Sequence, residues 1–130
     1  MSWQTILAIG SGGFLGAILR AYLNGVFNKL VPHILPFGTL GVNLIGSLIM
    51  GCLFALFAYT DFFSPPLKSF LSTGLLGALT TYSTFAIETF WLFEGGSLML
   101  GTLNILLNAI GTIFFATGGY KMMEYFLKIN

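Results

Sequence analysis

Four long apolar segments separated by short loops constrain the fold more than any other feature of this chain. They cover residues 3–27, 37–59, 67–93 and 97–126. Each exceeds the roughly 20 residues that a helix needs to cross a bilayer. The loops between them hold the proline pairs, the Gly-Gly step and several of the charged residues. The sequence therefore predicts an all-α membrane protein, in which residues 1–130 form one domain of four transmembrane helices.

The composition excludes several classes of protein. Charged residues make up 7% of the chain, whereas an ordinary soluble domain has about 25%. Five basic and four acidic residues leave no basic patch for nucleic acid. Cys52 is the single cysteine, so it forms no intrachain disulfide, and we interpret it as a small buried apolar residue. One histidine, one cysteine and few carboxylates assemble no nucleophile–base set, so we expect no enzymatic activity.

The loop charges give almost no preference for one orientation in the membrane. An even number of spans places both termini on one side, together with Lys68, Lys121 and Lys128. The other side has Lys29, and Arg20 if its side chain extends to the interface. A chain with so small a bias can insert in both directions. This balance permits an antiparallel dimer of identical subunits.

The third apolar segment contains a glycine pair and a run of hydroxyl residues, within Gly74–Glu88. A bilayer offers no water to free backbone groups, so a broken helix survives there only when it is buried in protein or lines a wet cavity. Such breaks present helix ends and free carbonyl groups to ions. We therefore predict that the third helix is broken near mid-membrane and that the protein handles an ion.

Glycines recur at spacings that suit close packing of helices. Gly12 and Gly16 form a small-xxx-small pair in the first segment. The second segment contains further glycines, at Gly38, Gly41, Gly46 and Gly51. We interpret most of these glycines as helix-packing positions.

The fourth segment carries a polar stripe on an otherwise apolar helix. Asn104, Asn108 and Thr112 are spaced at i, i+4 and i+8. Two interpretations stay open: the stripe lines a pore, or its side chains form hydrogen bonds between helices. Asn43, early in the second segment, presents the same choice.

Two charged residues within the spans also have more than one interpretation. Arg20 either faces a cavity and attracts anions, or extends to the membrane interface. Glu88 is an acidic residue within the third span. It either transfers protons or lies near the mouth of a pathway.

An aromatic pair follows the expected break. Tyr82 and Phe85 are three residues apart and share a helix face. Ring edges are electropositive, so two edges aimed at one point would hold a small anion, although simple packing would also explain the pair. Ser83 and Thr84 add hydroxyl donors, or cap the second half of the helix.

Together these motifs resemble the Fluc (CrcB) family of bacterial fluoride channels. The resemblance covers nearly the whole chain and rests on residues 12–20, 38–46 and 77–85, of which the last stretch is the most specific. It implies a passive channel of the bacterial inner membrane that exports fluoride and relieves its toxicity. It also implies an antiparallel, dual-topology homodimer with two pores, embedded in lipid.

The resemblance implies a structural sodium ion at the dimer centre. Backbone carbonyl groups at Gly77 and Thr80 of both subunits would bind it, as suits a hard cation. A side chain at Gly77 would crowd these converging carbonyl groups, because only glycine accepts close backbone approach and positive φ without steric cost.

The resemblance also implies a set of fluoride-pathway residues. The set consists of Asn43, Tyr82, Phe85, Ser83, Thr84, Arg20, Asn104, Asn108 and Thr112. One position departs from the family, which usually has phenylalanine where this chain has Tyr82. The added hydroxyl leaves open whether that ring contacts fluoride.

Two other functions compete with a fluoride channel. A small four-span proton-coupled multidrug transporter needs a carboxylate early in its first span, and this chain has none there. Glu88 is the only substitute. A non-conducting assembly subunit would leave the polar stripe of the fourth segment without a role.

Overall fold

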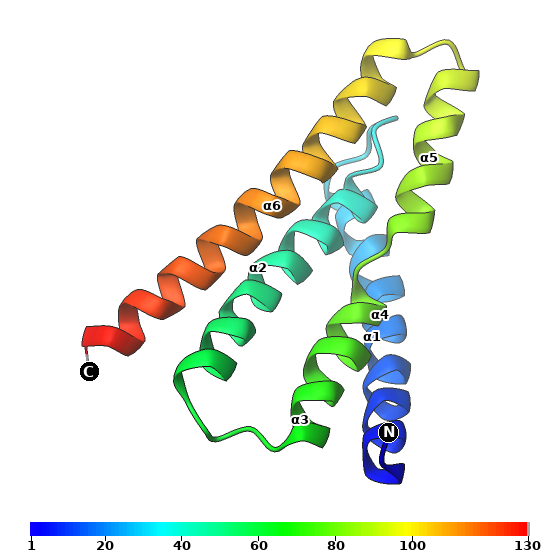
Figure 1. Ribbon diagram of the computed structural model, residues 1–130. Helices are drawn as coiled ribbons and strands as arrows, with labels where there is room; N and C mark the ends of the chain where they lie inside the picture. The colour runs from blue at the N-terminus through cyan, green and yellow to red at the C-terminus, as the bar shows by residue number, and fades with distance from the viewer. Residues whose placement is uncertain (130) are drawn as a thin grey trace.

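The computed structural model describes residues 1–129 and is helical throughout (Figure 1). Its elements are α1 (Trp3–Leu30), α2 (Phe37–Tyr59), α3 (Pro65–Ser69), the π-helical segment η1 (Phe70–Leu76), α4 (Gly77–Leu79), α5 (Tyr82–Glu94) and α6 (Leu98–Ile129). Within the described residues, four helical stretches are long and apolar enough to cross a membrane: α1, α2, Pro65–Glu94 and α6. The predicted all-α, four-span class is therefore confirmed. Residue 130, which the predicted domain includes, lies outside the described residues.

Local signals in the sequence set the ends of the helices. The Ser2 side chain accepts a hydrogen bond from the Thr5 N–H at 3.2 Å and caps α1. Pro65 lies in the first turn of α3, where its missing N–H costs nothing. Gly96 follows α5 with φ of 81°, a conformation that favours glycine.

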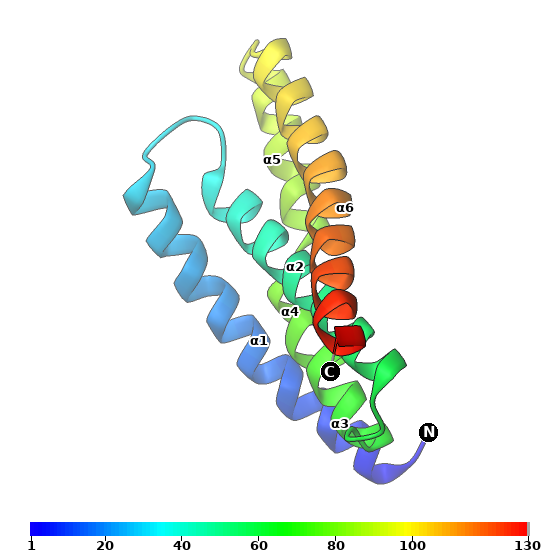
Figure 2. The same ribbon diagram turned by 90° about the vertical axis from the view of Figure 1, so that its left-hand side faces the viewer.

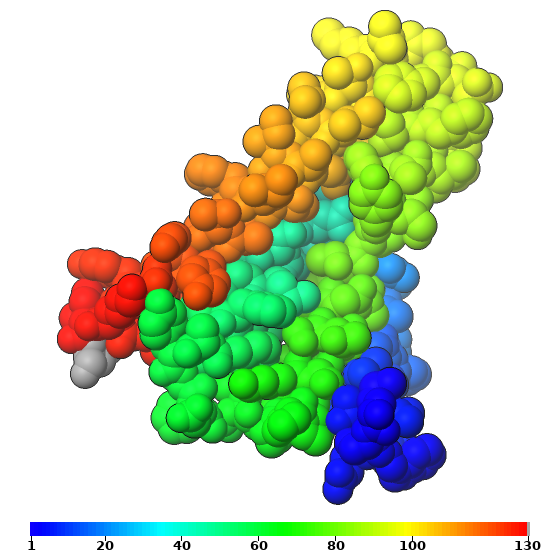
Figure 3. Space-filling view, in the orientation of Figure 1, coloured from blue at the N-terminus to red at the C-terminus, as the bar shows by residue number. Residues whose placement is uncertain are grey.

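Both chain ends and the α2–α3 loop lie at one end of the molecule, and the α1–α2 and α5–α6 loops lie at the other (Figures 1 and 2). We call the first the terminal end and the second the loop end. Three lysines belong to the terminal end: Lys68 in α3, and Lys121 and Lys128 in the last part of α6. In the space-filling view α6 forms a ridge that runs along α2 from the loop end to the terminal end (Figure 3).

Glycines allow α2 and α6 to touch through their backbones. A methyl group at Gly51 would collide with the carbonyl oxygen of Ala116 and would lie 2.8 Å from the Tyr120 nitrogen. From the opposite side, a methyl group at Gly119 would collide with the carbonyl oxygen of Leu48. Small residues are what permit such close approach of membrane helices.

Glycines also allow the backbones of α1 and η1 to touch. A methyl group at Gly12 or Gly16 would collide with carbonyl oxygens of η1, and one at Gly74 would lie 2.8 Å from the Ile9 oxygen. The packing interpretation of the Gly12–Gly16 pair is therefore confirmed. In α2, added methyl groups at Gly38, Gly41 and Gly46 would likewise meet neighbouring atoms.

The third apolar stretch is not one continuous helix. The α4 helix ends at Leu79, after which Thr80 (φ −78°, ψ 154°) and Thr81 (φ −146°, ψ 119°) are extended, and α5 begins at Tyr82. Gly77 has φ of −62°, an ordinary helical value, so its backbone conformation does not require glycine. An added methyl group at Gly77 would meet only the Ser72 oxygen, at 3.4 Å. Nothing in the chain's own packing therefore demands glycine at this position.

The packing of α6 on α2 makes a prediction about two adjacent glycines. Gly119→Ala places a methyl group against the Leu48 carbonyl and should lower the free energy of unfolding by about 1–3 kcal/mol. Gly118 has nothing within 4 Å, so Gly118→Ala should raise it by about 0.5–1 kcal/mol through reduced backbone entropy. Thermal unfolding of the detergent-solubilised proteins measures both effects. Equal unfolding temperatures for the two variants would show that α2 and α6 do not touch at Gly119.

Candidate functional site

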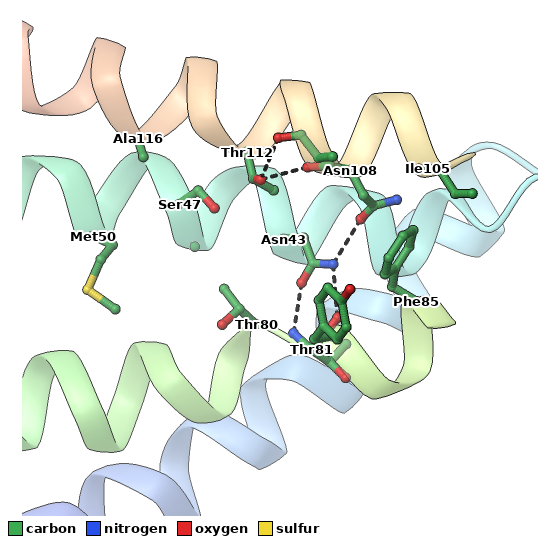
Figure 4. A pocket seen from close by; sticks show the side chains of 13 residues that line it. Asn43, Ser47, Met50, Thr80, Thr81, Phe85, Ile105, Asn108, Thr112 and Ala116 are labelled. Carbon is green, nitrogen blue, oxygen red and sulfur yellow. Dashed lines mark hydrogen bonds between the residues drawn. The ribbon is translucent and has the colours of Figure 1, made fainter. Parts of the chain in front are cut away.

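A groove of about 390 Å³ lies between α2, the extended residues Thr80 and Thr81, α5 and α6 (Figure 4). Two aromatic rings line it, those of Tyr82 and Phe85. The polar residues that line it are Asn43, Ser47, Thr80, Thr81, Asn108 and Thr112. Among the described lining residues none carries a charge.

Asn43 forms hydrogen bonds to the backbone of Thr81, in the extended interruption between α4 and α5. Its Oδ1 accepts a hydrogen bond from the Thr81 N–H at 2.8 Å, and its Nδ2 donates to the Thr81 carbonyl at 3.0 Å. The same Nδ2 donates to Asn108 Oδ1 at 2.9 Å. The Thr81 nitrogen is only a donor, so it fixes the orientation of the Asn43 amide. Both Nδ2 hydrogens are therefore engaged, and Asn43 has no spare N–H in the groove.

The hydrogen bonds continue from Asn108 in a single direction, toward α5. Asn108 Nδ2 donates to the carbonyl and Oδ1 of Asn104, at 3.0 and 3.1 Å. Asn104 Nδ2 donates to Thr89 Oγ1 at 2.9 Å, and Thr89 Oγ1 donates to the Phe85 carbonyl at 2.7 Å. This series of amides ties α2, α6 and α5 together.

The polar stripe of α6 has two different environments. Asn108 and Thr112 line the groove, while Asn104 is fully buried and lies outside the lining. Asn104 therefore serves as a hydrogen-bonding residue between α6 and α5. Thr112 Oγ1 donates to the Asn108 carbonyl at 2.6 Å, so its hydroxyl hydrogen is also engaged.

The N-terminal end of α5 lies at the groove. Thr81 is its N-cap, and the Thr81 side chain accepts a hydrogen bond from the Thr84 N–H at 3.3 Å. Thr81 Oγ1 also donates to Thr84 Oγ1 at 3.0 Å, so Thr84 belongs to the cap. Ser83 is exposed, and neither Ser83 nor Thr84 lines the groove. A helix N-terminus carries partial positive charge and favours anions.

The aromatic rings meet edge to face. Their centroids are 5.5 Å apart, at an interplanar angle of 61°. The Phe85 side chain is held in the protein at 9% exposure, whereas Tyr82 is 82% exposed. Tyr82 therefore presents its ring on the side that this chain leaves uncovered.

Ser47 differs from the other hydroxyl residues in the groove. Thr80 Oγ1 donates to the Leu76 carbonyl at 3.1 Å, and Thr112 is bonded as described. Within residues 1–129 the Ser47 hydroxyl makes no hydrogen bond, so its O–H is free to donate into the groove.

Glu88 lies in a separate cavity of about 360 Å³ at the loop end, near His33 and Trp91. Thr39 Oγ1 donates to Glu88 Oε1 at 2.9 Å. The other carboxylate oxygen, Oε2, is buried without a hydrogen-bond partner among the described residues. Glu88 is thus outside the groove of Asn43.

Arg20 and Gly77 lie away from the groove lining. Arg20 is half-buried on α1 and makes no side-chain hydrogen bond or ion pair within the described part of the chain. Gly77 is exposed. Its carbonyl loses the usual helical partner, because the Thr81 N–H bonds to Asn43 instead. The described residues contain no cluster of three or more His, Cys, Asp or Glu side chains.

Thr81 has a central position in the site that was not predicted from the sequence. The signal in the sequence is weak: threonine is a residue type that favours the N-cap position, but Thr84, three residues later, is not the Glu or Gln of a capping box. Its partnership with Asn43 has no such signal, because 38 residues separate the two.

Comparison with known proteins gives a consistent assignment. Residues 7–120 match the family described as "CrcB-like protein, Camphor Resistance (CrcB)". A protein of Sulfurimonas denitrificans named fluoride-specific ion channel FluC is 62% identical over 128 residues, which cover 98% of this chain and 99% of that protein.

Relatives with the same name occur in two further bacteria. The protein of Nautilia profundicola is 51% identical, over 98% of this chain and 100% of that protein. A Campylobacter jejuni protein is 47% identical, over 93% of this chain and 98% of that protein. With its four membrane-length helices and this similarity over nearly its whole length, the chain is a multi-pass membrane protein that belongs to the CrcB (Fluc) family.

Proposed function

We propose that this chain forms a passive, fluoride-specific channel of the bacterial inner membrane, and that it is not an enzyme. The names of its relatives support this function. The observation that carries it is the uncharged groove at the N-terminal end of α5. A multidrug transporter is not favoured, because no carboxylate lies early in the first span.

The groove offers three kinds of weak anion donor. The N-terminal turn of α5 supplies partial positive charge. The Tyr82 and Phe85 rings supply electropositive edges, and Ser47 supplies a free hydroxyl. Fluoride would exchange its hydration shell for these donors. Export needs no other energy source, because a negative interior drives an anion outward with about 2.3 kcal/mol per 100 mV.

Two copies of the chain would complete the pore. Tyr82 is 82% exposed, and Gly77 is exposed although nothing in the chain requires its lack of a side chain. A second copy packed against this side would explain both features. The near-balance of basic residues between the terminal and loop ends suits an antiparallel, dual-topology homodimer. Lipid would cover the remaining apolar faces.

A sodium ion would suit the centre of this dimer. The freed Gly77 carbonyl, together with that of Thr80, supplies the hard oxygen ligands that such a cation prefers. Two copies would double the number of carbonyl groups. Arg20, whose charge has no partner in the described chain, would attract anions toward a vestibule. In this proposal Asn43, Asn108 and Thr112 line the pathway. Asn104 lies outside the lining and accepts hydrogen bonds from Asn108.

Fluoride efflux from liposomes that contain the purified protein tests the function, with chloride efflux as the control. We expect fluoride to leave and chloride to stay.

Phe85→Ile should slow fluoride efflux at least about tenfold, equivalent to about 1.4 kcal/mol, because an aliphatic side chain has no electropositive edge. Tyr82→Phe keeps the ring edge and should be tolerated. Equal efflux of both anions would refute the proposed selectivity, and full activity of a dimeric Phe85→Ile protein would refute the role of the ring.

Removal of the Asn43 side chain and removal of the Ser47 hydroxyl should have different effects on stability and on fluoride flux. Asn43→Ala leaves the Thr81 N–H and carbonyl unpaired, so it should lower the free energy of unfolding by about 2 kcal/mol or more, together with the fluoride flux. Ser47→Ala removes a hydroxyl without a protein partner, so it should lower flux at unchanged stability. Thermal unfolding and efflux of both variants give the comparison. Normal stability in Asn43→Ala would mean that Asn43 does not hold the interruption.

Labelling of cysteines at opposite ends tests dual topology. Ile34→Cys in the α1–α2 loop and Phe62→Cys in the α2–α3 loop place exposed thiols at the two ends, since Ile34 is 65% and Phe62 86% exposed. Each substitution is made in a Cys52→Ala background. In sealed vesicles an impermeant reagent should label a fraction of the protein at both sites. Full labelling at one site and none at the other would establish a single orientation.

A further inference from the structure

A second cavity extends the groove toward the terminal end of the molecule. It has a volume of about 460 Å³ and follows the contact between α2 and α6. Met50 and Ala116 line both it and the first groove. The remaining lining residues are Gly51, Phe54, Thr117, Tyr120 and Lys121. The two cavities therefore adjoin at Met50 and Ala116, and we call the region that they cover, from the Tyr82–Phe85 pair to Lys121, the path.

Lys121 is the charged residue of this path among the described lining residues. Its side chain is 69% exposed, so its ammonium group faces solvent at the end of the path. Lys121 Nζ lies 2.9 Å from Glu124 Oε2. An exposed lysine that is fully neutralised by its own carboxylate would have little effect on a distant anion, so the charge balance of this pair decides its role.

Glu124 is shared among several partners. Lys128 Nζ lies 2.9 Å from Glu124 Oε1, and the Tyr59 hydroxyl donates to the same oxygen at 2.6 Å. The Glu124 side chain is 13% exposed, against 59% for Lys128. Two exposed ammonium groups thus surround one shielded carboxylate. The cluster carries one excess positive charge on its solvent side.

We infer that Lys121 is an anion-attracting residue at the terminal mouth of the fluoride path, with Glu124 limiting the strength of its field. The inference rests on the proposed fluoride channel and adds a residue that acts through long-range attraction rather than through contact in the groove. A charged mouth raises the local concentration of the attracted ion and the rate at which it enters. The partial neutralisation by Glu124 keeps the site from binding the anion so tightly that it cannot proceed inward.

The inference predicts opposite effects for the two members of the ion pair. Lys121→Gln removes the attracting charge and should lower fluoride flux about two- to fivefold at low salt. Glu124→Gln keeps the side-chain shape and an acceptor for the Tyr59 hydroxyl, but frees the positive charge, so it should raise flux by a similar factor. A cluster that only fastens α6 to α2 would change flux in the same direction in both variants.

Ionic strength separates attraction from structural damage. Fluoride efflux is measured at about 10 mM ionic strength, where the Debye length is about 30 Å, and at about 1 M, where it is about 3 Å, with an impermeant salt. The variants should differ from the unaltered protein at low salt and converge with it at high salt. Lys121→Glu reverses the charge and should give a larger loss at low salt than Lys121→Gln, also with convergence. Lys29→Gln makes the same change in charge at the loop end, outside the lining of the path, and should give a smaller loss at low salt than Lys121→Gln, also with convergence.

The outcomes distinguish this inference from the proposed function. Absence of fluoride-selective efflux from the unaltered protein would refute both. Normal efflux that is the same for both Lys121 variants at low salt would refute the role of Lys121 alone. Losses in Lys121→Gln and Glu124→Gln that persist at high salt would also refute it, because they would identify the cluster as structural.

Discussion

The structure depends on how the Asn43 side chain pairs with the backbone of Thr81. An interruption in an apolar helix exposes an N–H and a carbonyl that lipid cannot satisfy. One amide side chain satisfies both, with bonds of 2.8 and 3.0 Å. Because these bonds hold Thr81 in an extended conformation, α5 begins at Tyr82 and directs its N-terminal end at the groove. The positions of the two aromatic rings follow from this start.

Close packing of backbones makes that pairing possible. Hydrogen bonds from α2 to Thr81 and to Asn108 require the three segments to meet within the reach of one short side chain. Glycines remove the side chains that would keep them apart, at Gly51 and Gly119 between α2 and α6. At Gly46 an added methyl group would collide with the Thr80 side chain, right beside the interruption. The glycines therefore act on the site although none of them offers a donor to an ion.

Periodicity and composition were sufficient to predict the four helices, the glycine packing and the shared face of the α6 stripe. They were insufficient wherever a role depends on a partner distant in the sequence. The sequence left Asn43 open between lining a pore and bonding between helices; it lines the groove, and Thr81 and Asn108 engage both of its N–H groups. Asn104 has the same spacing as its neighbours on the stripe, yet faces Thr89 on α5. The need for glycine at position 77 does not show in this chain's own packing, and one sequence does not reveal whether a glycine serves its own turn or a neighbouring chain.

The distribution of charge along the path suits an ion that must both enter and leave. A full positive charge deep in the groove would replace the hydration of a small anion and then hold it, whereas the described lining there is neutral and offers only partial charges. Full charges lie instead at the solvent end, where water screens them and where Glu124 offsets one of two lysines. In the proposed channel, attraction at the mouth and weak binding inside would then be the tasks of different residues. The amides reinforce this separation, because each donates to the protein in the direction of α5 and none leaves a strong donor to trap the ion.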